Sequence, residues 1–260
     1  MDNLVQNRFR TAALLVTLVT AVALGGCSGD GASSGESSPA TTASASASGL
    51  PTDDAAFSIT GEESEPLVVE FSNGTKTVTY IPMIHIAKKV FYQGVAKRVA
   101  EEKEKGATLF YEYIDFDTLS DADKRKARRL VGILPTPEQY AEIAEGSGYV
   151  GQSNDDYLGL VNDKDVDVDI TAEDLIAAYE ERFGPIQVEG EDATSDLSEP
   201  SMDVLPQDQV MQIVLDARNQ TVADAIADGP EHIVLLFGAA HGPGIFADLQ
   251  EKDPDWQRTK

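Results

Sequence analysis

Short apolar runs alternate with amphipathic stretches along the chain from about residue 65 onwards. Residues 67–71 and 75–81 are rich in β-branched side chains that partly alternate with polar ones, and Asn73-Gly74 lies between them. This pattern predicts two strands joined by a tight turn, because Asn-Gly readily adopts the positive φ angles of a two-residue hairpin. We therefore expect the folded part to open with a β-hairpin.

Helical and strand-like segments alternate after this hairpin. The helical spacing of Phe91, Val95 and Val99 predicts a helix that Gly106 ends. The run at 233–237 is apolar throughout, as in strands that helices cover on both faces. A further strand is expected at 107–114, and further helices at 119–134, 137–144, 171–183, 207–228 and from Gly244 onwards. This order predicts an α/β fold with a mixed, largely parallel sheet and helices on both faces.

Two charged stretches interrupt the pattern. The helix expected at 119–134 carries a basic cluster at 124–129, and residues 190–201 form an acidic, serine-rich loop. Because a run of charge on a helix is usually a solvated face, we expect the basic cluster to pair with acidic neighbours at the surface.

The first part of the chain has a different composition. Arg8 and Arg10 precede an uncharged apolar run that is too short for a comfortable membrane span. This order is typical of a secretory signal. The next residues, Leu24-Gly-Gly-Cys27, resemble a bacterial lipobox, which implies cleavage before Cys27 and lipid on its thiol. The Ser-, Ala- and Thr-rich segment that follows predicts a flexible tether.

We therefore expect three parts in the chain. These are a signal peptide at 1–26, a lipidated and flexible segment at 27–64, and one α/β domain at 65–260. Cys27 is the only cysteine, so no disulfide is possible within one molecule. Acyl chains on its thiol, palmitate among them, would anchor the domain to the cell membrane on its extracytoplasmic face. The formal net charge of −25 repels nucleic acid, so no nucleic-acid partner is expected.

Three polar side chains lie near the ends of expected strands. His85 and His241 each follow one strand, and Glu112 lies near the end of another. In an open α/β sheet, functional groups gather beyond the carboxyl ends of the strands. Two imidazoles and a carboxylate are suitable ligands for a divalent metal with one open position. Each residue also has a structural interpretation: a histidine at a strand end is often only hydrogen-bonded, and Glu112 can pair with a core arginine.

The order and spacing of these motifs resemble the TraB/GumN family, which includes the Tiki metalloproteases and is related to ChaN-like and erythromycin-esterase-like proteins. Gly238-Ala-Ala-His241 is similar to the second of the family's two Gly-x-x-His motifs, and Pro82-Met-Ile-His85 stands in the place of the first. Tyr111-Glu-Tyr-Ile-Asp115 is similar to the family's acidic strand, and Arg218-Asn219 to its Arg-Asn step. Residues 157–160 and 167–171 resemble its middle region more loosely. Pro82 departs from the motif glycine: it lacks an N–H and fixes φ.

The resemblance implies a metal-dependent hydrolase that acts on a peptide or a small molecule, with manganese or cobalt as the metal and zinc as an alternative. The implied metal ligands are His85, Glu112 and His241; the implied catalytic groups are Glu112 and Arg218; and the implied supporting residues are Asp115 and Asn219. Arg218 would orient Glu112 or hold a substrate carboxylate. Two alternatives stay open: a non-catalytic lipoprotein that binds a metal, haem or a peptide, and a scaffold in which Glu112 and Arg218 merely pair.

Overall fold

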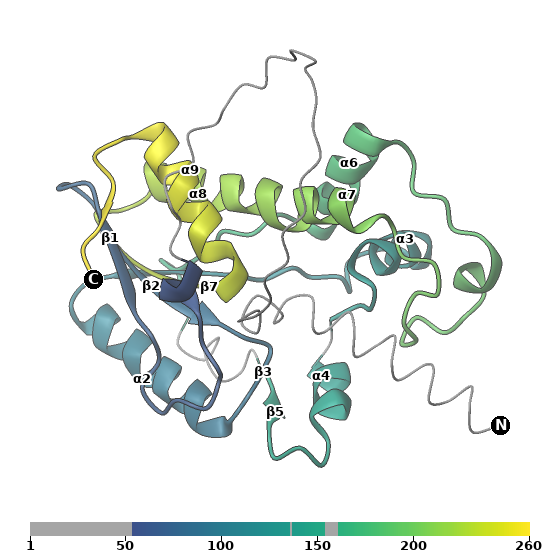
Figure 1. Ribbon diagram of the computed structural model, residues 1–260, viewed down its shortest axis with the longest axis horizontal. Helices are drawn as coiled ribbons and strands as arrows, with labels where there is room; N and C mark the ends of the chain where they lie inside the picture. Colours follow the sequence, from purple (N-terminus) through teal and green to yellow (C-terminus); the bar gives the residue numbers. More distant parts are fainter. Residues whose placement is uncertain (1–53, 136, 154–160) are drawn as a thin grey trace, which may run out of the picture.

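A six-stranded sheet forms the centre of the molecule, and helices pack on both of its faces (Figure 1). The computed structural model describes residues 54–135, 137–153 and 161–260. The expected signal peptide, Cys27, most of the tether and residues 157–160 lie outside these ranges. The strands of the sheet are β1 (Val69–Ser72), β2 (Thr77–Met83), β4 (Thr108–Tyr111), β6 (Val166–Asp167), β7 (His232–Gly238) and β8 (Gln257–Arg258).

The sheet is mixed and mostly parallel. Its strand order is β6-β4-β7-β2-β1-β8; the first four strands are parallel, and β1 is antiparallel to both of its neighbours. The opening hairpin is present, since β1 and β2 pair antiparallel. In its turn Gly74 has a φ of +85°, and the side-chain oxygen of Asn73 accepts the N–H of Lys76 at 2.8 Å. The predicted fold class and hairpin are thus confirmed.

The expected helices are present, with small changes in their bounds. They are α2 (Lys89–Glu104), α3 (Asp121–Val131), α4 (Pro137–Ala144), α6 (Ala172–Phe183), α7 (Gln207–Met211), α8 (Arg218–Asp228) and α9 (Gly242–Lys252). Several features escaped the sequence pattern, among them the short strands β6 and β8 of the central sheet. A π-helical stretch, Gln212–Ala217, separates α7 from α8. A second, two-stranded sheet pairs β3 (Ile86–Ala87) with β5 (Val150–Gly151), and such short strands carry no readable periodicity.

Strand β7 is buried on both of its faces, as its continuous apolar run predicts. Ile233, Leu235 and Phe237 pack on the side of α8 and α9, whereas Val234 and Leu236 pack against α2. Each of these side chains is at most 1% exposed. Pro82 lies within β2, opposite Phe237 of β7. Strand β1 pairs only with the earlier part of β2, up to Tyr80, so a proline at position 82 removes no hydrogen bond to β1.

The folded body includes residues that precede Glu65. Phe57, at the end of a 3₁₀ turn (Asp54–Phe57), is buried, and its ring centroid lies 5.8 Å from that of Tyr80. It also packs on the start of α9. A β-carbon at Gly242 would come within 2.2 Å of the Phe57 ring and 2.7 Å of the Tyr80 ring, so this contact requires a glycine.

The basic cluster on α3 is not the solvated face that its composition predicts. Arg128 is fully buried, and its guanidinium donates to the backbone carbonyl oxygens of Asp192, Asp196 and Glu199. The prediction was wrong for this residue because its partners come from a loop more than sixty positions away. Arg128 thereby fixes the acidic loop to α3.

In the described ranges, no helix combines the length and apolarity needed to span a membrane.

Candidate functional site

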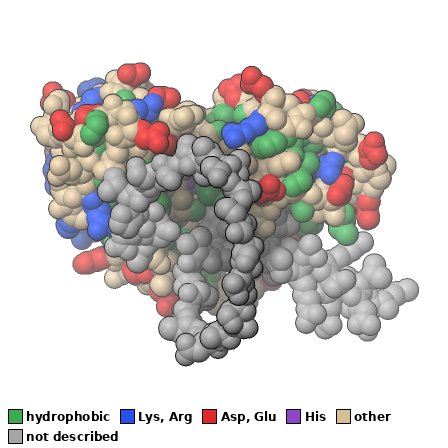
Figure 2. All heavy atoms as spheres, turned by 45° about the horizontal axis from the view of Figure 1, so that its top comes forward, with side chains coloured by type: hydrophobic (Ala, Val, Ile, Leu, Met, Phe, Trp, Pro, Cys, Tyr) green, Lys and Arg blue, Asp and Glu red, His purple; other side chains and the backbone are tan. Residues whose placement is uncertain are grey.

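The expected residues gather beyond the carboxyl ends of β2, β4 and β7. Glu112 directly follows β4, and its N–H donates to the carbonyl of Leu236 at 3.0 Å. His241 ends the 3₁₀ turn (Ala239–His241) that follows β7, and His85 lies two residues past the end of β2. On the face drawn in Figure 2, histidine atoms are visible in a hollow between two halves of the surface.

Glu112 is held at both carboxylate oxygens. Its Oε1 accepts a hydrogen bond from Arg218 Nη2 at 2.5 Å, and its Oε2 accepts the N–H of Gly238 at 2.6 Å. The side chain is 19% exposed. Burial is the largest single effect and by itself would raise the pKa of Glu112, but the charges of Arg218, His241 and His85 and the hydrogen bond from Arg218 together outweigh it and lower the pKa to about 2. Glu112 is therefore an oriented, ionised carboxylate at neutral pH.

Arg218 bridges Glu112 and a second carboxylate. Its Nε and Nη2 donate to the two oxygens of Asp169 at 2.8 and 2.6 Å. Such a bidentate pair fixes the orientation of the guanidinium plane and of the carboxylate plane. Its Nη1 reaches the carbonyl of Val214 at 3.4 Å, and the guanidinium lies 5.3 Å from the centre of the Phe237 ring. Of the two roles expected for Arg218, these contacts support the orientation of Glu112.

Asp169 was missed by the sequence analysis. Its side chain is fully buried, at the point where the chain passes from β6 towards α6. Burial raises the pKa of Asp169, and the Arg218 guanidinium opposes this shift. The residues here read Asp167-Val-Asp-Ile, and their alternation gives the only signal that every second carboxylate shares a side. Nothing local distinguishes the buried Asp169 from the exposed Asp167.

His241 is buried and carries a defined tautomer. Its Nδ1 lies 2.7 Å from the amide oxygen of Asn219, which accepts a hydrogen bond from an N–H at this position, so that the ring lone pair is on Nε2. The ring also meets Phe237 edge-on, with centroids 4.8 Å apart. Burial first, and the charge of Arg218 second, lower the pKa of His241 to about 3. The imidazole is thus neutral at neutral pH, as a ligand or a proton acceptor must be.

Two glycines allow this packing. An ideal β-carbon on Gly238 would lie 3.3 Å from both Glu112 Oε2 and His241 Cδ2, so a side chain there would crowd both groups. A β-carbon on Gly244 would come within 2.0 Å of the Asn219 amide nitrogen. The absence of a side chain at Gly238 and at Gly244 therefore allows Glu112 and Asn219 to pack closely around His241.

The π-helical stretch Gln212–Ala217 ends directly before Arg218 and Asn219. These two consecutive residues contact different members of the site, Glu112 and His241 respectively. A π-turn widens the helix locally and is frequent at functional sites. It changes the angle at which α8 presents its first two side chains. The sequence analysis expected one continuous helix over 207–228 and so did not predict this change.

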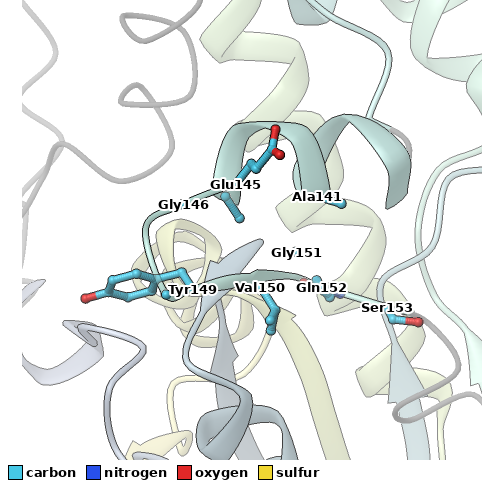
Figure 3. Close-up of a pocket in the computed structure, with 10 residues that line it drawn as sticks. Ala141, Glu145, Gly146, Tyr149, Val150, Gly151, Gln152 and Ser153 are labelled. Atoms are coloured by element: carbon cyan, nitrogen blue, oxygen red, sulfur yellow. The ribbon is translucent and has the colours of Figure 1, made fainter.

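His85 stands at the edge of the group. It is half-buried, and its ring stacks on Tyr140 of α4 with centroids 4.9 Å apart and an 8° angle. Its backbone carbonyl accepts the N–H of Gln152 at 2.7 Å. Burial lowers the pKa of His85, and the charge of Glu112 opposes this. A hollow between α4 and β5 is lined by residues such as Ala141, Tyr149 and Gln152 (Figure 3). Gln152 is the residue whose N–H donates to the carbonyl of His85.

Asp115 does not reach the cluster. Its carboxylate accepts the N–H of Asp117 at 2.9 Å, and its carbonyl accepts the Thr118 hydroxyl at 2.9 Å. These contacts shape the turn after β4. The structure therefore gives Asp115 a local role and gives the supporting position that was expected for it to Asp169.

The donor types in the site fit a divalent metal, because neutral imidazole nitrogens and a carboxylate are ordinary ligands for manganese, cobalt or zinc. Their spacing does not form a closed site. Within the described residues, no group of three His, Cys, Asp or Glu side chains is placed to hold one ion. Both oxygens of Glu112 accept hydrogen bonds, although a carboxylate has about four lone-pair positions in total.

We expect His241 to make the stability of the protein depend on pH. Between its pKa of about 3 in the folded state and the ordinary value of 6.5, only the unfolded chain binds a proton. The stability that the neutral His241 gives to the folded state is therefore complete above pH 6.5 and is lost as the pH falls towards 3. His241→Gln should flatten the unfolding free energy against pH in this window, by up to about 1.4 kcal/mol per pH unit.

Urea denaturation across this window measures the slope. His232→Gln, which removes an exposed histidine, is the matched control. Equal slopes in the two variants would contradict the expectation.

Comparisons with protein-family models, with curated proteins and with solved structures give no match to this chain. The resemblance to the TraB/GumN family therefore stays a prediction from the motifs.

Proposed function

We propose that the chain is a lipid-anchored protein on the extracytoplasmic face of a bacterial cell membrane and a metal-dependent hydrolase of the TraB/GumN type, with peptides as its first candidate substrates. One observation supports this most. An ionised Glu112 and a neutral His241 lie together beyond the strand ends, and a second residue holds each of them. Functional groups that are oriented in this way are prepared for ligation and proton transfer.

His85, Glu112 and His241 would hold the ion, which when bound lowers the pKa of a water ligand and polarises a carbonyl. The chain's own groups supply the rest. Asn219 keeps the proton on Nδ1 of His241, so Nε2 can accept a bond or a proton. Arg218 keeps Glu112 ionised. Because the present spacing does not close a three-ligand site, the proposal requires His85 to approach Glu112 on loading.

A second candidate is a non-catalytic lipoprotein that uses the same histidines to bind a metal, haem or a peptide. The engagement of both Glu112 oxygens favours it, because such a carboxylate is less free to act on a substrate. The pairing of Glu112 with Arg218 is also what a purely structural scaffold requires. Loss of stability in Glu112→Gln is therefore expected under every proposal, and only affinity and turnover distinguish them.

Metal binding tests the first proposal. The protein is dialysed against EDTA, refilled with Mn²⁺, Co²⁺ or Zn²⁺, and analysed by elemental analysis and calorimetry. We expect one ion per chain. His85→Ala and His241→Ala should weaken binding strongly, and Asn219→Ala by about 10- to 100-fold, as for other residues that orient a metal ligand. His232→Ala should bind as the unchanged protein does.

Peptide hydrolysis by the loaded protein, abolished in Glu112→Gln, would complete the case. Absence of any metal binding at micromolar concentration would contradict the proposal. A haem Soret band that is lost in His85→Ala or His241→Ala would support the second candidate instead.

The anchor has its own test. We expect the chain expressed in a bacterium to fractionate with membranes and to incorporate labelled palmitate. Cys27→Ser should lose both properties, because the acyl chains attach to that thiol. Ser28→Ala, next to the acceptor, is the control. Palmitate in the Cys27→Ser protein would contradict the assignment.

A further inference from the structure

Two buried tyrosines donate hydrogen bonds to the main chain of the segments that carry the two histidines of the site. The hydroxyl of Tyr80, on β2, donates to the carbonyl of Gly238 at 2.7 Å, and the carbonyl of Phe237 lies 3.1 Å from the same oxygen. The hydroxyl of Tyr92, on α2, donates to the carbonyl of Ile84 at 2.8 Å. Tyr80 is fully buried and Tyr92 is 3% exposed. The two side chains belong to different hydrophobic clusters, on opposite faces of the sheet.

Gly238 joins Tyr80 to the rest of the site. Its N–H donates to Glu112 Oε2 at 2.6 Å and its carbonyl accepts the Tyr80 hydroxyl, so this residue is held on both sides. His241 follows three positions later, at the end of the 3₁₀ turn. The Tyr80 ring also lies against the other end of this turn, because a β-carbon on Gly242 would come within 2.7 Å of the ring. Tyr80 therefore contacts the main chain both before and after His241.

Tyr92 has the equivalent place at His85. The carbonyl that it binds belongs to the residue directly before this histidine, and the carbonyl of His85 itself accepts the N–H of Gln152. The main chain at His85 is thus held from α2 and from the residue after β5. The approach of His85 to Glu112 that the proposed function requires is therefore left to the imidazole side chain.

We propose that Tyr80 and Tyr92 are positioning residues, Tyr80 for His241 and Tyr92 for His85. Each hydroxyl gives its one proton to backbone carbonyl oxygens, so each tyrosine acts through a histidine and not on a substrate. Supporting hydrogen bonds that fix the place of a ligand strengthen metal binding. The consequence for metal binding rests on the proposed function, whereas the positioning is a property of the metal-free protein.

The two histidines offer separate signals for this positioning. The His241 ring meets Phe237 edge-on, with centroids 4.8 Å apart, and the His85 ring stacks on Tyr140 at 4.9 Å. The ring-proton resonances of each histidine therefore depend on its place against one aromatic ring. NMR of the full chain in detergent, with isotope-labelled histidine, without metal and at one fixed pH, follows both of them. The exposed His232 is the internal reference.

The two variants should act crosswise. Tyr80→Phe keeps the buried ring and removes the hydroxyl, so it should shift the resonances of His241 and leave those of His85 in place. Tyr92→Phe should shift the resonances of His85 and leave those of His241 in place. Each variant is thus a control for the other. A merely structural role of the tyrosines predicts lower stability in both variants without this selectivity.

Tyr179→Phe is a third, matched variant. Tyr179 is also buried, and its hydroxyl donates to the side chain of Gln209 at 2.7 Å rather than to a segment that carries a histidine of the site. It should shift neither His85 nor His241.

Metal binding by the same proteins separates the two claims. Tyr80→Phe and Tyr92→Phe should each weaken the binding of Mn²⁺, Co²⁺ or Zn²⁺ by about tenfold, and Tyr179→Phe should not. Crosswise shifts in the metal-free protein without metal binding in any variant would support the positioning and overturn the proposed function.

The inference fails separately from the proposed function. A folded variant that leaves its own histidine unmoved, or that shifts both histidines equally, would overturn the inference for that tyrosine even where the unchanged protein binds metal. If Tyr80→Phe does not fold, NMR contacts between the Tyr80 ring and Gly242 in the unchanged protein decide, and their absence overturns the inference. If Tyr92→Phe does not fold, contacts between the Tyr92 ring and Ile84 decide in the same way.

Discussion

One guanidinium shared by two carboxylates is the interaction on which the site depends. A buried carboxylate without a partner is costly, and Glu112 and Asp169 are tolerated together because Arg218 donates to both. The same contacts join the first turn of α8 to the chain after β4 and after β6. The ion pair therefore fixes both the charge of Glu112 and the position of the helix that carries Asn219. Through Asn219 it also fixes the tautomer of His241.

The glycines around His241 have the complementary role of providing space. Gly238 leaves room between Glu112 and His241. Gly242 leaves room for the rings of Phe57 and Tyr80, and Gly244 leaves room for the side-chain amide of Asn219. A short segment thus receives side chains from an N-terminal turn, from β2, from the end of β4 and from α8. This density explains why a histidine that follows an apolar strand is buried, neutral and oriented rather than free in a loop.

The sequence predicted the parts of this arrangement that local patterns encode. The apolar run of β7, the Asn73-Gly74 turn and the helical spacing of Phe91, Val95 and Val99 in α2 are all local. The positions of His85, Glu112 and His241 at strand ends followed from the rule for parallel sheets. The partners could not be predicted in the same way. Asp169, the buried Arg128 and the π-helical turn depend on residues about 50 positions or more away, or on a helix register that apolar spacing does not reveal.

A double-mutant cycle on unfolding free energy tests the Arg218–Glu112 interaction most directly. The unchanged protein, Glu112→Gln, Arg218→Met and the double variant are unfolded in urea at neutral pH. The account predicts a coupling energy above about 1 kcal/mol, because Arg218→Met leaves the buried Glu112 carboxylate without its cationic partner, whereas the same change in the Glu112→Gln background meets no carboxylate at that position. Effects that add within about 0.5 kcal/mol would show that Arg218 does not hold Glu112, and would contradict the account.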